Sequence, residues 1–281
     1  ACNLKCPDCV ETSSKFVVQS KIFEKEKFFR VIDEIYEDTL IMALYLSGEP
    51  FLHKDIFKMI NYGHSKRMYM YLSSNFSMKI NEQFASNIVN SGLDAMFISV
   101  SGNTNESHQR MHVGGDIEVV KNNIKMLQNR KKALNSKYPK VAIRYLMAKY
   151  NTDEMNQLSE FARENGCEFF EVSLMAFSNT NDDSNESMHQ ERIDENKVCF
   201  WPWLMLAMHS DGQVQTCCKY PYNLPIIGNV STQTVSQLWN SKIQNQFREK
   251  MSRGKNGLES CKNCEASFGF QRTMYDLPQD V

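Results

Sequence analysis

The chain has 281 residues, enough for one large domain or for a medium and a small one. Its formal net charge of −1 favours neither nucleic acid nor an anionic membrane surface as a partner. No apolar run approaches the ~18 residues of a membrane-spanning helix and no signal peptide is visible, so we expect a cytoplasmic protein without a membrane partner.

The chain opens on three closely spaced cysteines, Cys2, Cys6 and Cys9. A loop this short can direct three thiolates to one point, but it does not readily supply a fourth ligand. Three soft thiolates suit an iron–sulfur cluster that leaves one iron open. A structural zinc site would require a fourth protein ligand, and three cysteines without any metal are the remaining interpretation.

Helices and strands are predicted to alternate along the next part of the chain. Apolar residues recur at helical spacing from Phe28 to Tyr36, and the unbroken apolar run 40–46 is typical of a parallel strand buried on both faces. Further helices are expected at 54–63, 81–91, 116–132 and 153–165, and further strands at 68–72, 95–100, 141–147 and 169–175. This alternation indicates right-handed crossovers and a parallel sheet with its chemistry at the carboxyl ends of the strands.

Five strands are visible, and we expect a sixth upstream of Ala1 that feeds the cysteine loop, so that the natural chain begins earlier. The fold class predicted is α/β: a partial (β/α)6 barrel at 1–177, followed by a small α+β domain. The segment 178–197 is polar and lacks hydrophobic periodicity, which predicts a linker or an exposed loop. The second domain, 198–281, holds a second group of cysteines.

This second group comprises Cys199, the adjacent pair Cys217 and Cys218, and Cys261 and Cys264. A hairpin that turns at Asp211-Gly212 would bring Cys199 and Cys217 together across two strands, while the last two cysteines chelate from one tight loop. Neighbours on a strand point to opposite faces, so only one residue of the adjacent pair should be a ligand. Four thiolates form a closed site, which by chemistry alone suits zinc or a [4Fe–4S] cluster.

The Cys2–Cys9 spacing, together with polar turns after the strands, resembles the radical S-adenosylmethionine (SAM) superfamily. Ser47-Gly48-Glu49-Pro50 is similar to the family's Gly-Gly-Glu-Pro turn, which implies that Gly48, Glu49 and Pro50 hold the amino group of SAM. Ser47 replaces the first glycine, which a serine with negative φ permits. Without the resemblance, this turn would be an ordinary strand-to-helix connection.

Later strand ends carry further similarities. Ser73-Ser74-Asn75 resembles Thr-Asn-Gly, and Ser99-Val100-Ser101-Gly102 resembles Ser-Leu-Asp-Gly, which implies that Asn75 and Ser99 approach SAM. Arg110 falls where the family often places an arginine for the SAM carboxylate. Arg144 lies inside an apolar strand, and a buried arginine requires an anionic partner. We therefore expect it to bind SAM or substrate if it faces inward, or else to extend to water at the strand end.

The second cysteine group resembles the auxiliary-cluster domain of the same superfamily, in its shorter form (twitch) rather than the full SPASM form. The features that carry this likeness are the interval from Gly212 to Cys217, a turn at 227–230, a helix around Leu238-Trp239 and the last Cys-x-x-Cys. The resemblance implies two [4Fe–4S] clusters, the first on Cys2, Cys6 and Cys9 and the second on Cys199, Cys217, Cys261 and Cys264. Cys167 and Cys218 are then spare.

The resemblance implies a radical SAM oxidoreductase. SAM binds the open iron, its one-electron reduction gives a 5′-deoxyadenosyl radical, and the radical removes a hydrogen atom from the substrate. The cysteine spacing is similar to that of aminocyclitol dehydrogenases, which favours oxidation of a sugar- or cyclitol-type small molecule with the second cluster as electron acceptor. A reductant such as flavodoxin or ferredoxin is implied. The alternatives are a peptide-modifying maturase, an epimerase, and a non-enzymatic zinc or electron-transfer protein.

His108 and His112 stand four residues apart, a spacing that binds zinc on a helix. No third ligand accompanies them, so we expect histidines that face solvent or substrate. Cys167 is expected to serve packing.

Overall fold

The computed structural model describes residues 1–7, 9, 22–173, 198–218, 224–262 and 264. Within these residues the chain forms two compact units. The first holds 1–7, 9 and 28–173, and the second holds 22–27, 198–218, 224–262 and 264. The expected linker at 178–197 lies outside the described residues.

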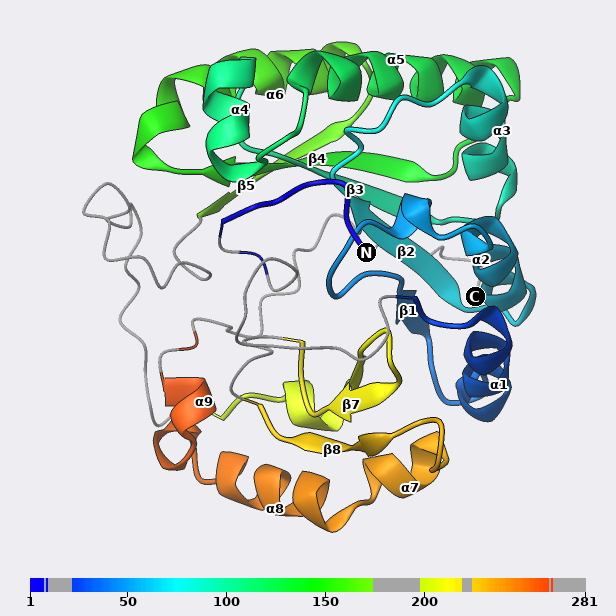
Figure 1. Ribbon diagram of the computed structural model, residues 1–281, viewed down its shortest axis with the longest axis vertical. Coiled ribbons are helices and arrows are strands. Elements are labelled where there is room, and N and C mark those ends of the chain that lie inside the picture. Colours follow the sequence, from blue (N-terminus) through cyan, green and yellow to red (C-terminus); the bar gives the residue numbers. More distant parts are fainter. Residues whose placement is uncertain (8, 10–21, 174–197, 219–223, 263, 265–281) are drawn as a thin grey trace. The chain divides into compact units, whose positions relative to one another are not determined.

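The first unit is built on a parallel sheet of five strands in the order β1-β2-β3-β4-β5 (Figure 1). The strands are β1 (Ile41–Ala43), β2 (Tyr69–Ser74), β3 (Ala95–Val100), β4 (Lys140–Met147) and β5 (Glu168–Ser173). The order follows the chain because each strand is joined to the next by a helical crossover. The predicted parallel α/β architecture is thereby confirmed.

Helices precede and connect these strands, and several of them begin at polar capping residues. They are α1 (Lys25–Ile35), α2 (Ile56–Ser65), α3 (Glu82–Asn90), α4 (Asn105–Met111), α5 (Ile117–Ala133) and α6 (Met155–Glu164), with 3-10 turns η1 (Pro50–Leu52) and η2 (Lys149–Glu154). Asn81 caps α3 by accepting from the Phe84 N–H, and Asp116 caps α5 by accepting from Glu118 and Val119. The sequence patterns predicted these two helices but not the short α4.

One strand prediction was wrong in extent. The apolar run 40–46 was expected to form a strand buried on both faces, but β1 covers only Ile41–Ala43, and Leu40 is 69% exposed. The reason is that β1 lies at the edge of the described sheet and pairs only with β2. By contrast, β3 has the predicted bounds and lies between two neighbours.

The two faces of the sheet differ. The Met70 side chain lies directly against Gly63 of α2, where an added Cβ would come within 2.4 Å of its sulfur, so the helices cover this face. Because side chains alternate along a strand, Tyr71 and Ser73 of β2 point to the opposite face. Figure 1 shows α5 and α6 on the far side of β3 and β4 from that face. We call the face that carries Tyr71 the helix-free face.

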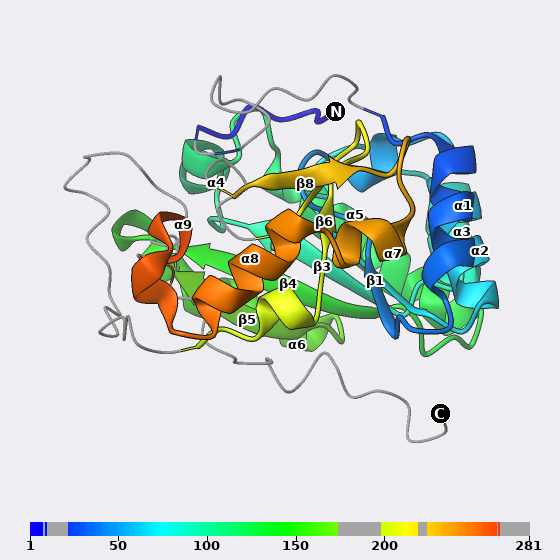
Figure 2. The ribbon, with the colours of Figure 1, turned by 90° about the horizontal axis from the view of Figure 1, so that it is seen from below.

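The second unit contains a three-stranded antiparallel sheet in the order β6-β7-β8, followed by helices α7 and α8 (Figure 2). Its elements are η5 (Trp201–Trp203), β6 (Ala207–Met208), β7 (Gln213–Gln215), β8 (Ile226–Asn229), α7 (Val235–Trp239), α8 (Lys242–Met251), η6 (Lys255–Gly257) and α9 (Glu259–Lys262). The hairpin expected at Asp211-Gly212 is present, with Gly212 at φ +87°.

One expectation for this unit needs correction, and another is confirmed. The turn expected at 227–230 is mainly strand β8, because Ile226–Asn229 pairs with β7. The helix expected around Leu238-Trp239 is α7, and a second helix, α8, follows at once with Ser241 as its cap. In neither unit does a described helix have the length and apolar character to cross a membrane.

Candidate functional site

The N-terminal cysteine loop is held by backbone and side-chain hydrogen bonds at the carboxyl ends of the first strands. The Glu49 N–H donates to the Ala1 carbonyl oxygen at 2.8 Å, and the Asn75 side-chain amide donates to the Asn3 side chain at 2.9 Å. Farther along the loop, the Lys5 N–H donates to the carbonyl of Val113 at 3.0 Å. The loop therefore lies where the turns after β1 and β2 meet.

The three thiols of this loop influence one another. Burial, together with the nearby thiols of Cys9 and Cys2, raises the pKa of Cys6 to about 12. The Asn75 amide also lies 3.7 Å from the Cys2 sulfur. Thiols that share a desolvated site are difficult to deprotonate unless a bound cation offsets the negative charge of the thiolates. An iron–sulfur cluster supplies that positive charge, so the donor set fits such a cluster.

Gly48 is required where it stands, both by its backbone conformation and by the space available. Its φ is +82°, and an added Cβ would lie 2.7 Å from the carbonyl oxygen of Ala1. Ser47 is not among the described non-glycine residues with positive φ, so a serine is accommodated there as the sequence predicted. The turn and the start of the cysteine loop thus depend on each other.

The Glu49 carboxylate is turned into the protein and is only 4% exposed. It accepts hydrogen bonds from the Ser74 hydroxyl at 2.8 Å, the Asn75 N–H at 2.8 Å and the Phe51 N–H at 3.2 Å. Burial raises its pKa, and these three donors act against that rise. The side chain therefore joins the turn after β1 to the end of β2, while its expected contact with SAM stays a prediction, as does that of Pro50, the first residue of η1.

Ser99 and Arg144 share the helix-free face at the ends of β3 and β4. They are direct neighbours in the register of these two strands. The Ser99 hydroxyl lies 3.4 Å from that of Ser73, and the Arg144 guanidinium stacks on the Phe97 ring at 4.2 Å from its centre. Among the described residues, Arg144 has no carboxylate or other hydrogen-bonding partner. Its charge is therefore available to a ligand.

Arg110 is not part of this group. It lies on α4, is exposed, and its guanidinium covers the Tyr150 ring at 4.8 Å. No hydrogen bond or ion pair of Arg110 is found within the described part of the chain. Its expected contact with the SAM carboxylate stays a prediction.

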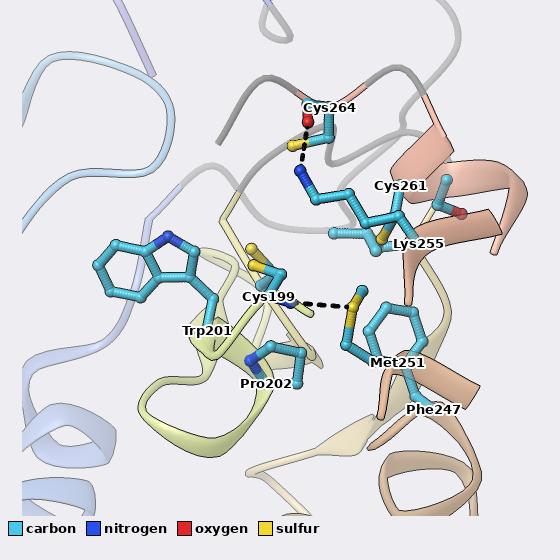
Figure 3. A pocket seen from close by; sticks show the side chains of 11 residues that line it. Cys199, Trp201, Pro202, Phe247, Met251, Lys255, Cys261 and Cys264 are labelled. Atoms are coloured by element: carbon cyan, nitrogen blue, oxygen red, sulfur yellow. Dashed lines mark hydrogen bonds between the residues drawn. The ribbon is translucent and has the colours of Figure 1, made fainter. Parts of the chain in front are cut away.

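The second unit brings four cysteines around one pocket (Figure 3). They are Cys199, Cys217, Cys261 and Cys264. Apart from Lys255 and Ser260, the other described walls are apolar: Trp201, Pro202, Leu224, Phe247 and Met251. These are the four residues that the sequence selected as ligands of the second cluster.

The loop with Cys199 is fastened to α8. The Cys199 N–H lies 3.4 Å from the Met251 sulfur (Figure 3), and both Gln244 and Arg248 donate to the Pro202 carbonyl at 2.9 Å. Cys199 precedes η5 and is not on a strand, so the hairpin does not by itself place it opposite Cys217. It is α8 that holds this thiol at the pocket.

Of the adjacent pair, Cys217 lines the pocket and is 8% exposed, whereas Cys218 is exposed and is not among the lining residues. Both follow the end of β7 instead of lying on it. This geometry supports Cys217 as the ligand, the choice made from its distance to Gly212.

Burial and the neighbouring thiols also govern proton binding here. The pKa of Cys261 is raised to about 12 by burial and then by Cys264 and Cys199, and burial raises the pKa of Cys199. Within the described ranges, no three Cys, His, Asp or Glu side chains are close enough to hold one metal ion. A four-iron cluster does not require that closeness, because each thiolate binds a different iron.

His108 and His112 do not face solvent or substrate, so that expectation was wrong. They are 0% and 5% exposed, and their rings stack at 4.6 Å. The Ser101 hydroxyl lies 2.7 Å from Nδ1 of His112 and donates to the His108 carbonyl at 2.9 Å. The pair therefore packs α4 against the end of β3. The local sequence gave no sign of this, because α4 was not recognised as a helix.

These imidazoles should make stability depend on pH. Burial lowers the pKa of His108 to about 4 and that of His112 to about 3, the latter also through His108. The unfolded chain binds protons from about pH 6.5 downward while the folded chain does not, so stability is full above pH 6.5 and is lost as the pH falls. Between pH 7 and pH 5 we expect a loss of up to about 2 kcal/mol for each imidazole, measured by denaturant unfolding. A double His108→Gln/His112→Gln variant should flatten this dependence, and an equally steep slope in the variant would contradict the assignment.

Lys255 is the residue at the second site that sequence reasoning missed. It lines the four-cysteine pocket and is 4% exposed. The available signal was the Gly254 and Gly257 pair around it, which marks a turn just before Cys261. Lysine is seldom buried, so its position alone did not point to the pocket.

The sequence model of the radical SAM superfamily matches residues 1–162. The chain belongs to the radical SAM superfamily. A second model, for an iron–sulfur cluster-binding domain called SPASM, matches residues 199–265. SAM and two [4Fe–4S] clusters are thus the cofactors of this radical SAM protein, and the two sets of cysteines fit the clusters.

Individual relatives are distant. The AdoMet-dependent heme synthase of Methanosarcina barkeri is 22% identical over 228 residues, which are 79% of this radical SAM chain and 61% of the relative. The chain thus spans less than two thirds of the length of this curated relative. A structure of BtrN in complex with AdoMet and 2-DOIA superposes with a TM-score of 0.57 at 16% identity, covering 94% of this chain and 89% of that one. Streptococcus suis SuiB bound to its precursor peptide SuiA superposes at 0.66 and 13%, covering 94% and 69%. At such identities the two superpositions establish the fold alone.

Proposed function

We propose that this radical SAM enzyme oxidises a hydroxyl-bearing small molecule of sugar or cyclitol type. The observation that carries the proposal is the presence of two different thiol sets in one chain. The first offers three thiols in one loop, and the second offers four around one pocket. Four protein thiolates leave no open iron for substrate, so the second site acts through electrons or through structure.

The chemistry balances for an oxidation. When bound, SAM and the first cluster supply a 5′-deoxyadenosyl radical. A substrate carbon that bears a hydroxyl gives up its hydrogen atom, and the resulting radical becomes a carbonyl by losing one proton and one electron. The thiols of Cys199, Cys217, Cys261 and Cys264 hold the group that takes this electron, and an external reductant such as flavodoxin or ferredoxin supplies the electron for SAM.

The helix-free face offers a surface for such a substrate. Aromatic rings follow one another across it, with ring centres 5.6 Å apart for Tyr45 and Tyr71, 6.0 Å for Tyr71 and Phe97, and 6.5 Å for Phe97 and Phe170. Tyr71 and Phe97 are buried, so the rings of this row that are open to the apolar face of a sugar or cyclitol are the partly exposed Tyr45 and Phe170. Arg144 stands over this row with an available guanidinium, and we propose that it binds the reacting hydroxyl and favours loss of its proton.

Substitution of Arg144 should separate substrate chemistry from SAM chemistry. In Arg144→Gln we expect kcat/KM for the oxidised product to fall about 10²-fold, because a charged hydrogen bond made during proton loss is removed. SAM binding and substrate-independent formation of 5′-deoxyadenosine should remain, and Arg144→Lys should recover part of the loss. Arg163→Gln, an exposed change on α6, is the control. If Arg144→Gln instead abolished SAM binding, the arginine would belong to the cofactor site.

The test of the function is a product assay on anaerobically reconstituted protein. Candidate sugars and aminocyclitols carrying deuterium at the reacting carbon should transfer that deuterium to 5′-deoxyadenosine and yield a ketone. The main competitor is peptide modification, since SuiB binds a peptide in the structure compared above. Deuterium transfer from a peptide only, or return of hydrogen without net oxidation, would replace the proposal by a maturase or an epimerase.

A further inference from the structure

Four cysteines line the pocket of the second unit. Among the other described residues of its lining, Lys255 is the one with a charged side chain. It is 4% exposed, although lysine side chains are almost never buried unless they meet negative charge. Its ammonium donates a hydrogen bond to the Cys264 carbonyl at 2.6 Å. Figure 3 shows the side chain passing Cys261 on its way to Cys264.

The position of this ammonium is fixed by the same short segment that carries two of the thiols. Gly254, at φ +99°, turns the chain out of α8, and η6 begins at Lys255. Backbone bonds then run from the Leu258 N–H to the Lys255 carbonyl at 2.9 Å and from the Cys261 N–H to the Leu258 carbonyl at 2.8 Å. Lys255 and Cys261 are therefore held by one short hydrogen-bonded segment.

The cation lines the same pocket as the four thiols, and its hydrogen bond to the Cys264 carbonyl holds it beside the segment that carries two of them. Its interaction with the thiolates is strong because the pocket is otherwise walled by apolar side chains, which leave little water to screen it. The ammonium thus favours negative charge on the thiolates that line the pocket with it.

Four thiolates bring more negative charge than the oxidised core of a [4Fe–4S] cluster offsets, and each electron that the cluster takes up adds another. Charge and hydrogen bonding near the sulfurs are among the factors that set the reduction potential of such a cluster. We propose that Lys255 is a built-in counter-charge that raises the reduction potential of the auxiliary cluster and so makes it a better electron acceptor. The acceptor role rests on the proposed function, whereas the effect on potential does not.

The test is a potentiometric titration of the reconstituted protein, followed by electron paramagnetic resonance. Lys255→Gln keeps a hydrogen-bond donor but removes the charge, and Lys255→Arg keeps both. We expect Lys255→Gln to lower the ratio of reduced to oxidised auxiliary cluster at least tenfold at a fixed potential, a shift of about 59 mV for one electron. The arginine variant should stay near the parent value, and the first cluster should be unchanged. Lys250→Met, an exposed change on α8, is the matched control.

An unchanged potential in Lys255→Gln with full iron content would overturn the proposal. If the glutamine variant loses the auxiliary iron while the arginine variant keeps it, charge is required and the proposal stands. Loss of iron in both variants would instead assign Lys255 a purely structural role. A lowered potential with unaltered oxidation of substrate would support the counter-charge and refute the acceptor role, so the two ideas fail separately.

Discussion

Replacing Cys6 with alanine is expected to abolish cleavage of SAM. Formation of 5′-deoxyadenosine under a strong reductant should fall to background, a loss of at least about 10²-fold. The reason is that all three thiolates of the loop are needed to hold a cluster that keeps one iron open. The Cys6 thiol is strongly perturbed, since its pKa is raised to about 12 by burial and by its two partners. Removing it leaves two ligands, too few to hold the cluster in place.

Iron analysis makes this result specific. The variant should lose about four iron atoms per chain and keep those of the auxiliary site. Cys167→Ala is the control, because Cys167 accepts a hydrogen bond from Gln128 at 3.1 Å and belongs to neither thiol set. Cleavage at the parent rate in Cys6→Ala would contradict the assignment of the first three cysteines to the SAM site.

Removing Cys261 and Cys264 together is expected to uncouple the reaction. Uncoupled formation of 5′-deoxyadenosine should be largely retained while the oxidised product falls below about 1% of the parent level, because the substrate radical then lacks its electron acceptor. The two activities should respond separately because the cysteine loop and the four-thiol pocket belong to different compact units. The measurement is the ratio of oxidised product to 5′-deoxyadenosine in the same anaerobic sample.

Folding must be checked alongside, because Cys217 and Cys261 pack with Leu224, Phe247 and Met251 in the core of the second unit. Circular dichroism and the absorption of the first cluster serve this purpose. Cys218→Ser is the matched control, since this exposed neighbour lies outside the pocket lining and its loss should change neither activity nor iron. Parent turnover in a well-folded double variant would favour an epimerase or a structural cluster.

Sequence patterns predicted the fold where burial is uniform along an element. Strand β3 was predicted residue for residue, because five of its six residues are buried and its composition is correspondingly apolar. The sequence selected the four cysteines that line one pocket because their arrangement resembles that of the auxiliary-cluster domain, and their role as ligands stays a prediction. The hydrogen bonds of the Glu49 side chain could not be predicted from the local sequence. Their donors at the end of β2, Ser74 and Asn75, lie 25 and 26 positions farther along the chain.

Burial of polar groups could not be predicted from local composition. His108, His112 and Lys255 are all polar, yet each is at most 5% exposed. In each case the covering contacts come from tertiary structure: the Ser101 hydroxyl for the histidines, and the four-cysteine pocket for the lysine. Propensity rules place such residues at the surface, so they fail where a fold uses polar groups inside.

The close approach of Ala1 to Gly48 affects how distant members of this superfamily should be sought by sequence. A side chain at position 48 is excluded twice, by φ +82° and by a carbonyl oxygen 2.7 Å from the Cβ position. Position 47 carries a serine without left-handed backbone, so it is not restricted in this way. A search pattern that demands both glycines of the Gly-Gly-Glu-Pro turn would reject this chain. One that leaves the first position open and keeps the second would retain it.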